Sequence, residues 1–126
     1  CERMKLHFFH SDEDSNQCLE LIQGTLASLY ATTLPHMGWK EVSANYEPLM
    51  EGTEAGPLYF VHSYAVRPSD ADVVTGTTQY ESESFASVVR SGRITGVQFH
   101  PERSGDAGLS VLANFVSTCA DVRHVA

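Results

Sequence analysis

Residues 94–105 constrain the fold more than any other part of the chain. They form the sequence Ile-Thr-Gly-Val-Gln-Phe-His-Pro-Glu-Arg-Ser-Gly. The apolar run at the start predicts a buried strand, and Pro101 prevents this strand from continuing past His100. Ligands bind at the carboxyl ends of strands in open α/β sheets, so His100 and Glu102 are candidate acid–base residues. The motif alone leaves open the alternative of a solvent-facing turn that happens to contain both.

Composition is typical of an ordinary globular domain. The chain has 126 residues, which is enough to bury one core. It has no apolar run near the roughly 18 residues of a membrane span, and no signal-peptide pattern. The formal net charge of −8 argues against nucleic acid as a partner, because phosphate binding needs clustered Lys and Arg. We therefore expect no membrane and no nucleic acid, but a small molecule or another protein.

The cysteines Cys1, Cys18 and Cys119 are an odd number at wide spacing. This favours a reducing cytoplasm over a disulfide framework. The six histidines lack metal-ligand spacing, so we expect no metal. We also expect no cofactor. A chain that starts on cysteine instead of methionine is expected to be processed or part of something longer.

The apolar and turn residues predict a chain rich in strands. A short helix is expected at residues 1–9, a loop at 11–17, a turn at 35–39 and a short extended piece at 41–43. Gly92 and Arg93 are expected to form a tight connection. The predicted strands are residues 19–22, 25–30, 58–64, 73–80, 85–89 and 94–99.

The clearest predicted helix follows Ser104 or Asp106, either of which can cap it. Cys119 lies on its expected apolar face and is interpreted as a small core residue, not a nucleophile. Strands that cluster before one closing helix make an incomplete doubly wound domain. The expected apolar face consists of Leu109, Leu112, Phe115, Val116 and Cys119.

Cys1 is the candidate nucleophile that His100 and Glu102 would activate. Pairing with a histidine lowers a thiol pKa towards the reactive thiolate. At the start of a predicted helix, the thiolate would also feel the positive end of the helix dipole, and the backbone N–H of Glu2 could stabilise an oxyanion. The alternative is that the chain merely begins at Cys1.

Three segments, taken in order, carry a resemblance to a known family: Leu-Pro-His-Met-Gly-Trp at residues 34–39, Tyr-Phe-Val-His-Ser-Tyr at 59–64, and residues 96–105. They closely resemble the glutaminase subunit of imidazole glycerol phosphate synthase, a class I Cys-His-Glu glutamine amidotransferase. The resemblance runs over about residues 1–116. It implies an α/β fold with a flavodoxin-like mixed sheet that is incomplete at its N-terminus. Residues 1–126 would then be the C-terminal part of a single amidotransferase domain, with an edge strand uncovered unless another chain pairs with it.

The resemblance also implies an activity. Cys1 would attack the carboxamide carbon of glutamine, His100 would act as general base and acid, and Glu102 would hold the imidazole. The products would be glutamate and ammonia. The ammonia would pass to a (β/α)₈-barrel cyclase subunit that makes imidazole glycerol phosphate in histidine biosynthesis.

Two further sets of residues follow from the resemblance. One set matches the strand end whose backbone receives glutamine, and the other matches family positions that face the barrel. The first set is His62, Ser63 and Tyr64, and the second is Met37, Trp39, Tyr59 and Arg103. Ordinary strand packing is the alternative for the first set, and core packing is the alternative for Trp39.

The match is partial at the start of the chain. The family has Gly-x-Cys-x-Gly-Met-Gln-Leu-Leu-Phe there, and this chain agrees only at Cys1, Met4, Leu6 and Phe8. Arg3 replaces a glycine, and Lys5 replaces a glutamine that helps to hold the substrate. The alternative function is therefore a non-catalytic or degenerate interaction module, or an inactive fragment.

Overall fold

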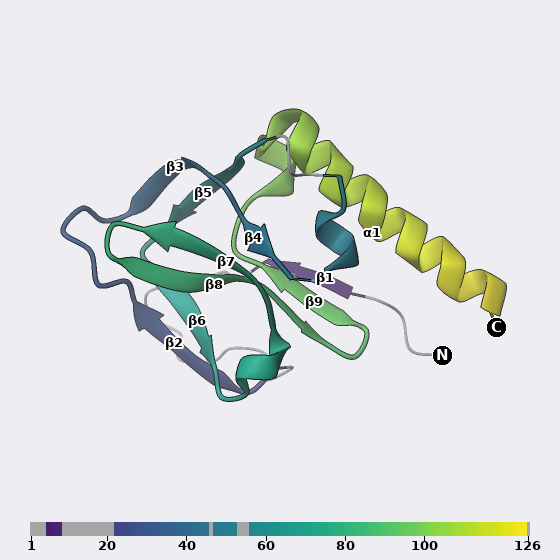
Figure 1. Cartoon of the computed structure of the whole chain (residues 1–126), viewed down its shortest axis with the longest axis horizontal. Coiled ribbons are helices and arrows are strands. Elements are labelled where there is room, and N and C mark those ends of the chain that lie inside the picture. Colours follow the sequence, from purple (N-terminus) through teal and green to yellow (C-terminus); the bar gives the residue numbers. More distant parts are fainter. Residues whose placement is uncertain (1–4, 9–21, 46, 53–55, 126) are drawn as a thin grey trace.

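The computed structural model describes residues 5–8, 22–45, 47–52 and 56–125, with side chains between residues 22 and 119 of these ranges. The described chain consists mainly of strands followed by one long helix (Figure 1). In chain order the elements are β1 (Lys5–Phe8), β2 (Gly24–Ser28), β3 (His36–Lys40), β4 (Ser43–Ala44), the 3₁₀ helix η1 (Pro48–Met50), β5 (Leu58–His62), β6 (Tyr64–Pro68), η2 (Ala71–Val73), β7 (Val74–Tyr80), β8 (Glu83–Ser91), β9 (Ile94–Val97), η3 (Pro101–Arg103) and α1 (Gly105–Val125).

A mixed five-stranded sheet has the order β1-β9-β8-β7-β4. β1 runs parallel to β9, and the other neighbouring pairs are antiparallel. β8 and β9 are joined by a two-residue turn in which Gly92 has a φ of +59°, a conformation that glycine adopts without steric cost. The combination of a mixed sheet with a helix confirms the predicted α/β class.

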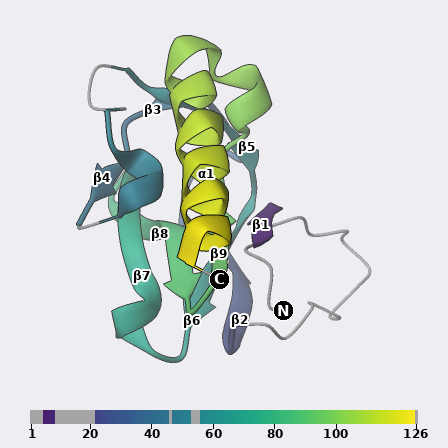
Figure 2. The ribbon, with the colours of Figure 1, turned by 90° about the vertical axis from the view of Figure 1, so that its right-hand side faces the viewer.

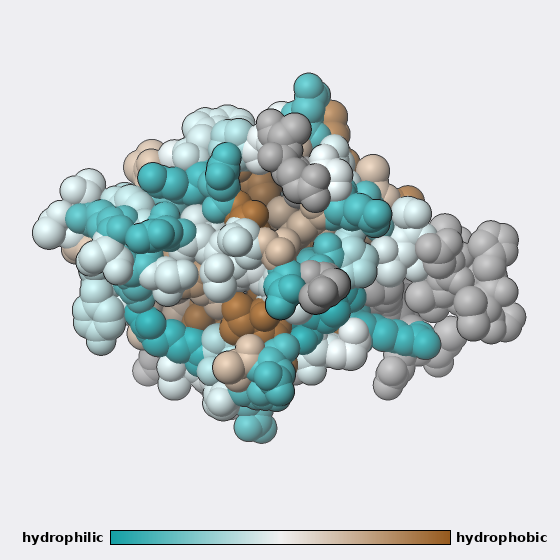
Figure 3. Space-filling view, in the orientation of Figure 1, coloured by the Kyte–Doolittle hydropathy of each residue, from teal (hydrophilic) through white to brown (hydrophobic). Residues whose placement is uncertain are grey.

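Two antiparallel ribbons flank this sheet in Figure 1. β2 pairs with β6, and β3 pairs with β5. α1 lies on one side of the molecule, as Figures 1 and 2 both show, and packs against η1, η3 and β5. The face drawn in Figure 3 is largely hydrophilic with two small hydrophobic areas near its middle, which agrees with the charged, globular composition.

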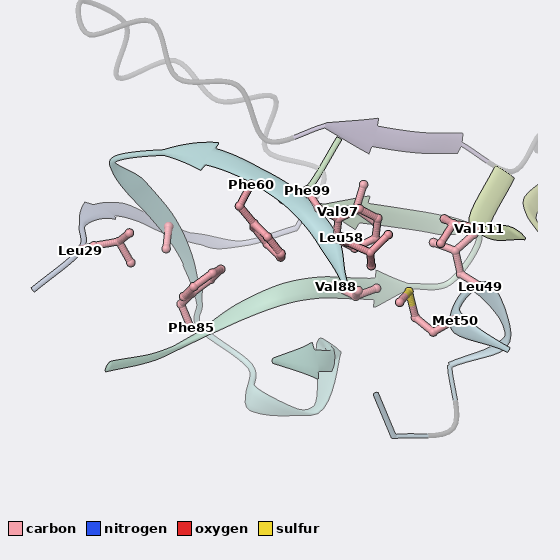
Figure 4. Packing of buried hydrophobic residues seen from close by; sticks show 11 residues of the cluster. Leu29, Leu49, Met50, Leu58, Phe60, Phe85, Val88, Val97, Phe99 and Val111 are labelled. Atoms are coloured by element: carbon pink, nitrogen blue, oxygen red, sulfur yellow. The ribbon is translucent and has the colours of Figure 1, made fainter. Parts of the chain in front are cut away.

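The core joins the ribbons, the sheet and α1 (Figure 4). Phe60 of β5 stands edge-on to Phe85 of β8 and to Phe99, with ring centroids 5.7 and 5.9 Å apart, an arrangement that aromatic quadrupoles favour. These contacts fix β5 against the segment that follows β9. The buried cluster is Leu29, Leu49, Met50, Leu58, Phe60, Ala65, Phe85, Val88, Val97, Phe99 and Val111.

Several predicted strands are confirmed. The strand predicted at 73–80 is β7 apart from Val73, which ends η2; residues 85–89 lie in β8, and the turn at Gly92 and Arg93 joins β8 to β9. The strands predicted at 25–30 and 94–99 are present but end earlier, at Ser28 and Val97. The extended piece predicted at 41–43 overlaps β4 only at Ser43. The loop at 11–17 lies outside the described residues, as does the strand at 19–22 except for Ile22, which is in a bend.

Three local predictions were wrong. Residues 5–8, expected in a helix, form β1; Met4, Leu6 and Phe8 recur every second residue, which is the period of a strand. The segment predicted as a turn at 35–39 is mostly β3, because pairing with β5 overrides its local preference. The single strand predicted at 58–64 is two strands separated by a bend at Ser63.

The apolar face of α1 also differs from the predicted one. Leu109 and Val116 are 63% and 65% exposed, whereas Val111 is fully buried in the core. Phe115 is partly buried against that core, and Cys119 is only partly buried. The helix is rotated because its first turn packs against η3, a contact that helical periodicity alone does not contain.

Candidate active site

The chain changes its pairing partner just before His100. Gln98 still donates its backbone N–H to the Ser87 carbonyl of β8, at 2.9 Å. Two residues later, the backbone N–H of His100 donates to the Tyr59 carbonyl of β5, also at 2.9 Å. Pro101 then begins η3, because proline fits the first turn of a helix, where its missing N–H is not needed. His100 therefore lies where the end of β9 meets β5.

Ser104 fixes this junction from the other side. Its hydroxyl donates to the His100 carbonyl at 2.6 Å and accepts the backbone N–H of Tyr59 at 2.9 Å. Ser104 stands directly before α1, where a cap was predicted, and its carbonyl accepts the backbone N–H of Gly108. Ser104 is only 2% exposed, and its hydroxyl binds β5 instead of capping the helix.

Gly108 allows α1 to approach η3 closely. A Cβ atom at this position would lie 1.9 Å from the Pro101 carbonyl oxygen, well inside any real contact distance. Only glycine fits without moving one of the two segments. The first turn of the helix thus supports the short turn that carries Glu102.

His100 and Glu102 form the predicted pair. Nδ1 of His100 lies 2.9 Å from Oε1 of Glu102, and their side chains are 29% and 51% exposed. A carboxylate can only accept, so Nδ1 carries the proton, and Nε2 of the neutral ring is the nitrogen that can take one up. This is the geometry of a base with a residue that orients it.

His62, Ser63 and Tyr64 lie together at the bend between β5 and β6. Nδ1 of His62 donates to the Tyr64 carbonyl at 2.9 Å, and the backbone N–H of Leu29 donates to the Ser63 carbonyl at 2.9 Å. Burial lowers the pKa of His62; the hydrogen bond to Tyr64 opposes this, and the charge of His100 lowers it further. The predicted substrate strand end is therefore close enough to His100 to feel its charge.

Three of the four residues predicted to face a partner lie together. In the β3–β5 ribbon, Met37 is opposite Val61 and Trp39 is opposite Tyr59. Side chains alternate along a strand, so Met37, Trp39 and Tyr59 share the face turned away from the core. Met37 is 62% and Trp39 is 51% exposed, and the Trp39 and Tyr59 rings meet edge to face. The core alternative for Trp39 is therefore wrong. Arg103, also exposed, lies in η3, which packs against β5.

The predicted nucleophile and oxyanion residue, Cys1 and Glu2, lie outside the described residues. The helix that was expected to follow them is a strand over Lys5–Phe8, so the helix-dipole argument for Cys1 loses its basis. Lys5 lies beside Ile94, at the end of β9 away from His100. The role of Cys1 stays a proposal.

Sequence reasoning missed the partner of His62. His36 is fully buried, and its Nδ1 lies 3.0 Å from Nε2 of His62. Burial lowers its pKa to about 4, with smaller contributions from His62 and Lys40. The position of His36 opposite His62 in the ribbon is the signal that could have found this pair, but β3 itself was not predicted.

The described residues offer neither a metal-binding cluster nor a helix suited to a membrane. They contain no group of three or more His, Cys, Asp or Glu residues arranged to hold a metal ion. Among the helices in this part of the chain, none combines the length and the apolar character needed to cross a membrane.

Comparison with known proteins decides the family. The model of the family "Glutamine amidotransferase class-I" matches residues 15–119, which include the His100–Glu102 pair. The chain belongs to the class I glutamine amidotransferase family. Within it, the chain is 39% identical over 123 residues to imidazole glycerol phosphate synthase subunit HisH of a Cyanothece species, covering 93% of this chain and 58% of that protein.

Other relatives agree with this similarity. The HisH subunit of Pyrococcus furiosus is 42% identical over 118 residues, which cover 91% of this chain and 61% of that protein. The subunit of Halobacterium salinarum is 41% identical over 116 residues, covering 89% and 53%. This amidotransferase chain thus spans between half and two thirds of the length of these relatives.

A solved structure supports the fold. A protein from Thermoplasma acidophilum that was assigned as a GMP synthase subunit superposes with a TM-score of 0.64 at 18% identity. The match covers 81% of this chain and 51% of that one. It confirms the predicted amidotransferase-like fold.

Proposed function

We propose that this chain acts in a glutaminase that hydrolyses glutamine to glutamate and ammonia for imidazole glycerol phosphate synthesis. The observation that carries the proposal is the 2.9 Å contact between Nδ1 of His100 and Oε1 of Glu102 at the end of β9. The contact occurs in a member of the class I amidotransferase family whose relatives are HisH subunits.

The proposed reaction uses three side chains. Nε2 of His100 takes the proton of the Cys1 thiol, the resulting thiolate attacks the carboxamide carbon, and the backbone N–H of Glu2 stabilises the oxyanion. His100 gives a proton to the departing ammonia, which leaves a thioester on the sulfur. His100 then takes a proton from water, whose attack releases glutamate and restores the thiol. Glu102 keeps Nδ1 of His100 protonated and stabilises the imidazolium when it forms.

Glutamine would lie against the bend at His62, Ser63 and Tyr64. The Ser63 and Tyr64 carbonyls already accept hydrogen bonds from Leu29 and His62, so this backbone is fixed before a ligand arrives. Backbone groups that are already held in place bind a substrate at a lower entropic cost than mobile ones.

The proposed partner is a (β/α)₈-barrel cyclase subunit that receives the ammonia. The exposed face formed by Met37, Trp39 and Tyr59 supports this, with Arg103 on the adjoining η3. Exposed aromatic, methionine and arginine side chains are the types enriched at protein interfaces. Because this face lies on β5, the same strand would touch both the partner and the substrate bend. Cytoplasmic localisation belongs to the same proposal.

The complete gene product, purified with the barrel cyclase subunit of the same organism, provides the test. We expect glutamate release from glutamine that Cys1→Ser and His100→Asn each abolish. Absence of release from the unaltered complex, or unchanged release by Cys1→Ser, contradicts the glutaminase. If the chain still binds the barrel in that case, its function is that of a non-catalytic interaction module instead of a glutaminase.

A further inference from the structure

His36 and His62 lie opposite each other on the core side of the β3–β5 ribbon. The His36 ring stacks on the Tyr80 ring, with centroids 4.0 Å apart, and also on Phe60, at 5.4 Å. His36 is fully buried, so water does not compete for its nitrogens. Its contact with His62 therefore depends on which nitrogens carry protons.

The hydrogen bonds settle the protonation of both rings. The Tyr64 carbonyl can only accept, so the proton of His62 is on Nδ1, and Nε2 of its neutral ring carries a lone pair. His36 must then donate from Nδ1 to that lone pair, across 3.0 Å. Its own Nε2 is left as a lone pair, and this atom has no hydrogen-bond partner within the described structure.

The opposite arrangement is costly. A proton on Nε2 of His36 would leave two lone pairs facing each other across the 3.0 Å contact with His62, and losing that buried hydrogen bond costs about 1–3 kcal/mol. Two hydrogen bonds in the same direction therefore run from His36 to His62 and from His62 to the Tyr64 carbonyl. Burial lowers the pKa of both histidines, which keeps both rings neutral, as these two hydrogen bonds require.

We propose that His36 is a positioning residue for glutamine binding: by donating to His62 it fixes the His62 tautomer, and thereby the Tyr64 carbonyl and the bend at Ser63. This inference rests on the proposed function. The Ser63 carbonyl is held separately by Leu29. A trans peptide points its N–H opposite to its carbonyl, so the two contacts together fix the direction of the backbone groups that glutamine would meet.

Two substitutions separate donation from packing. In His36→Phe the aromatic stacking is kept but the donor is lost. In His36→Asn the side-chain amide nitrogen falls near the position of Nδ1 and can donate to His62, although the smaller side chain packs less well. We expect His36→Phe to raise KM for glutamine roughly tenfold, by a larger factor than it lowers kcat, which corresponds to about 1.4 kcal/mol of binding. His36→Asn should return KM to near the original value.

A control and a spectroscopic measurement complete the test. Tyr80→Phe keeps the ring that stacks on His36 but removes the hydroxyl that donates to the Thr33 carbonyl at 2.6 Å. It should lower stability without changing KM. In ¹⁵N spectra, we expect His62 protonated on Nδ1 in the original protein and in His36→Asn, and mixed tautomers in His36→Phe.

The outcomes are distinct. Equal KM values for His36→Phe and the original protein, or equal defects in the Phe and Asn variants, overturn the inference. If the unaltered complex does not turn over glutamine, the proposed hydrolysis fails. The dissociation constant of glutamine, measured by calorimetry, is then compared among the variants instead of KM. The inference then stands if His36→Phe weakens binding and His36→Asn restores it, and falls if neither occurs or if no glutamine binds.

Discussion

Nδ1 of His100 and Oε1 of Glu102 are 2.9 Å apart, and the backbone of the same histidine is hydrogen-bonded to Tyr59 of β5. The backbone of His100, whose side chain the proposed reaction needs, is therefore held by β5. The same strand ends at the proposed substrate bend and carries Tyr59 of the exposed aromatic face. A displacement of β5 would move the imidazole directly.

Replacing Glu102 by Gln should lower kcat for glutamine hydrolysis roughly tenfold to a hundredfold, with little change in KM. The amide keeps the size of the side chain but removes the charge that stabilises the imidazolium. The measurement is steady-state glutamate release by the complex with the barrel. Glu51→Gln, an exposed acid-to-amide change elsewhere, is the matched control. A kcat for Glu102→Gln equal to that of this control would show that the carboxylate has no catalytic role.

Replacing Gly108 by Ala should reduce the free energy of unfolding by about 1–3 kcal/mol and also lower kcat. The added Cβ would collide with the Pro101 carbonyl, so η3 and Glu102 must move away from α1. Chemical denaturation and glutamate release measure the two effects. Ser117→Ala, an exposed position on the same helix, should change neither by much. Unaltered stability of Gly108→Ala would mean that α1 and η3 are not packed as described.

Replacing Arg90 by Met should reduce the free energy of unfolding by roughly 3–5 kcal/mol at pH 7. The Glu47 side chain is fully buried, accepts two hydrogen bonds from Arg90 and caps the backbone N–H of Leu49. Burial alone would raise the pKa of Glu47, but hydrogen bonds led by that from Arg90 lower it. Without Arg90 the pKa should rise, so the deficit should shrink as the pH falls towards 5. Denaturation curves at both pH values check this.

The double variant Glu47→Gln with Arg90→Met is the control for this pair. It removes the buried charge but keeps an oxygen that can cap Leu49, so it should recover part of the lost stability. If the double variant recovers no stability, the loss in Arg90→Met comes from packing and not from an unpaired carboxylate.

Stability should fall between about pH 6.5 and pH 4 because of His36. Its pKa is lowered from 6.5 to about 4 in the folded protein, chiefly by burial and also by His62 and Lys40. The unfolded chain therefore binds the proton first as the pH falls, and folding becomes less favourable. Between pH 7.5 and pH 5, His36→Phe should lose about 2 kcal/mol less than the original protein, at about 1.4 kcal/mol per pKa unit. Equal losses in urea denaturation would contradict a neutral, buried His36.

Replacing Trp39 by Ala should weaken binding to the barrel cyclase by roughly tenfold or more, since exposed aromatic anchors dominate interface energies. Stability should change little because Trp39 is half exposed. Calorimetric titration of the two proteins measures the affinity. Tyr30→Ala, which removes a 79% exposed aromatic ring outside the β3–β5 ribbon, is the control and should bind as the original does. Identical affinities for both variants would exclude this face as the interface.

The sequence by itself determined the features that depend on neighbouring residues. Alternating side chains predicted β7 and β8, glycine predicted the tight turn at Gly92, and Pro101 predicted that the strand could not pass His100, although β9 already ends at Val97. The spacing of His100 and Glu102 also predicted their pairing, because two residues separated by one position in a short turn can reach each other. These are local consequences of backbone geometry.

Tertiary structure alone decided what depends on contacts between distant segments. Residues 36–40 become a strand because β5, some twenty residues later, supplies their hydrogen bonds. That pairing brings His36 to His62 and places Trp39 beside Tyr59. The buried face of α1 is likewise set by Gly108 against Pro101, not by the period of its apolar residues. Such contacts form only when the chain closes on itself, so no local pattern specifies them.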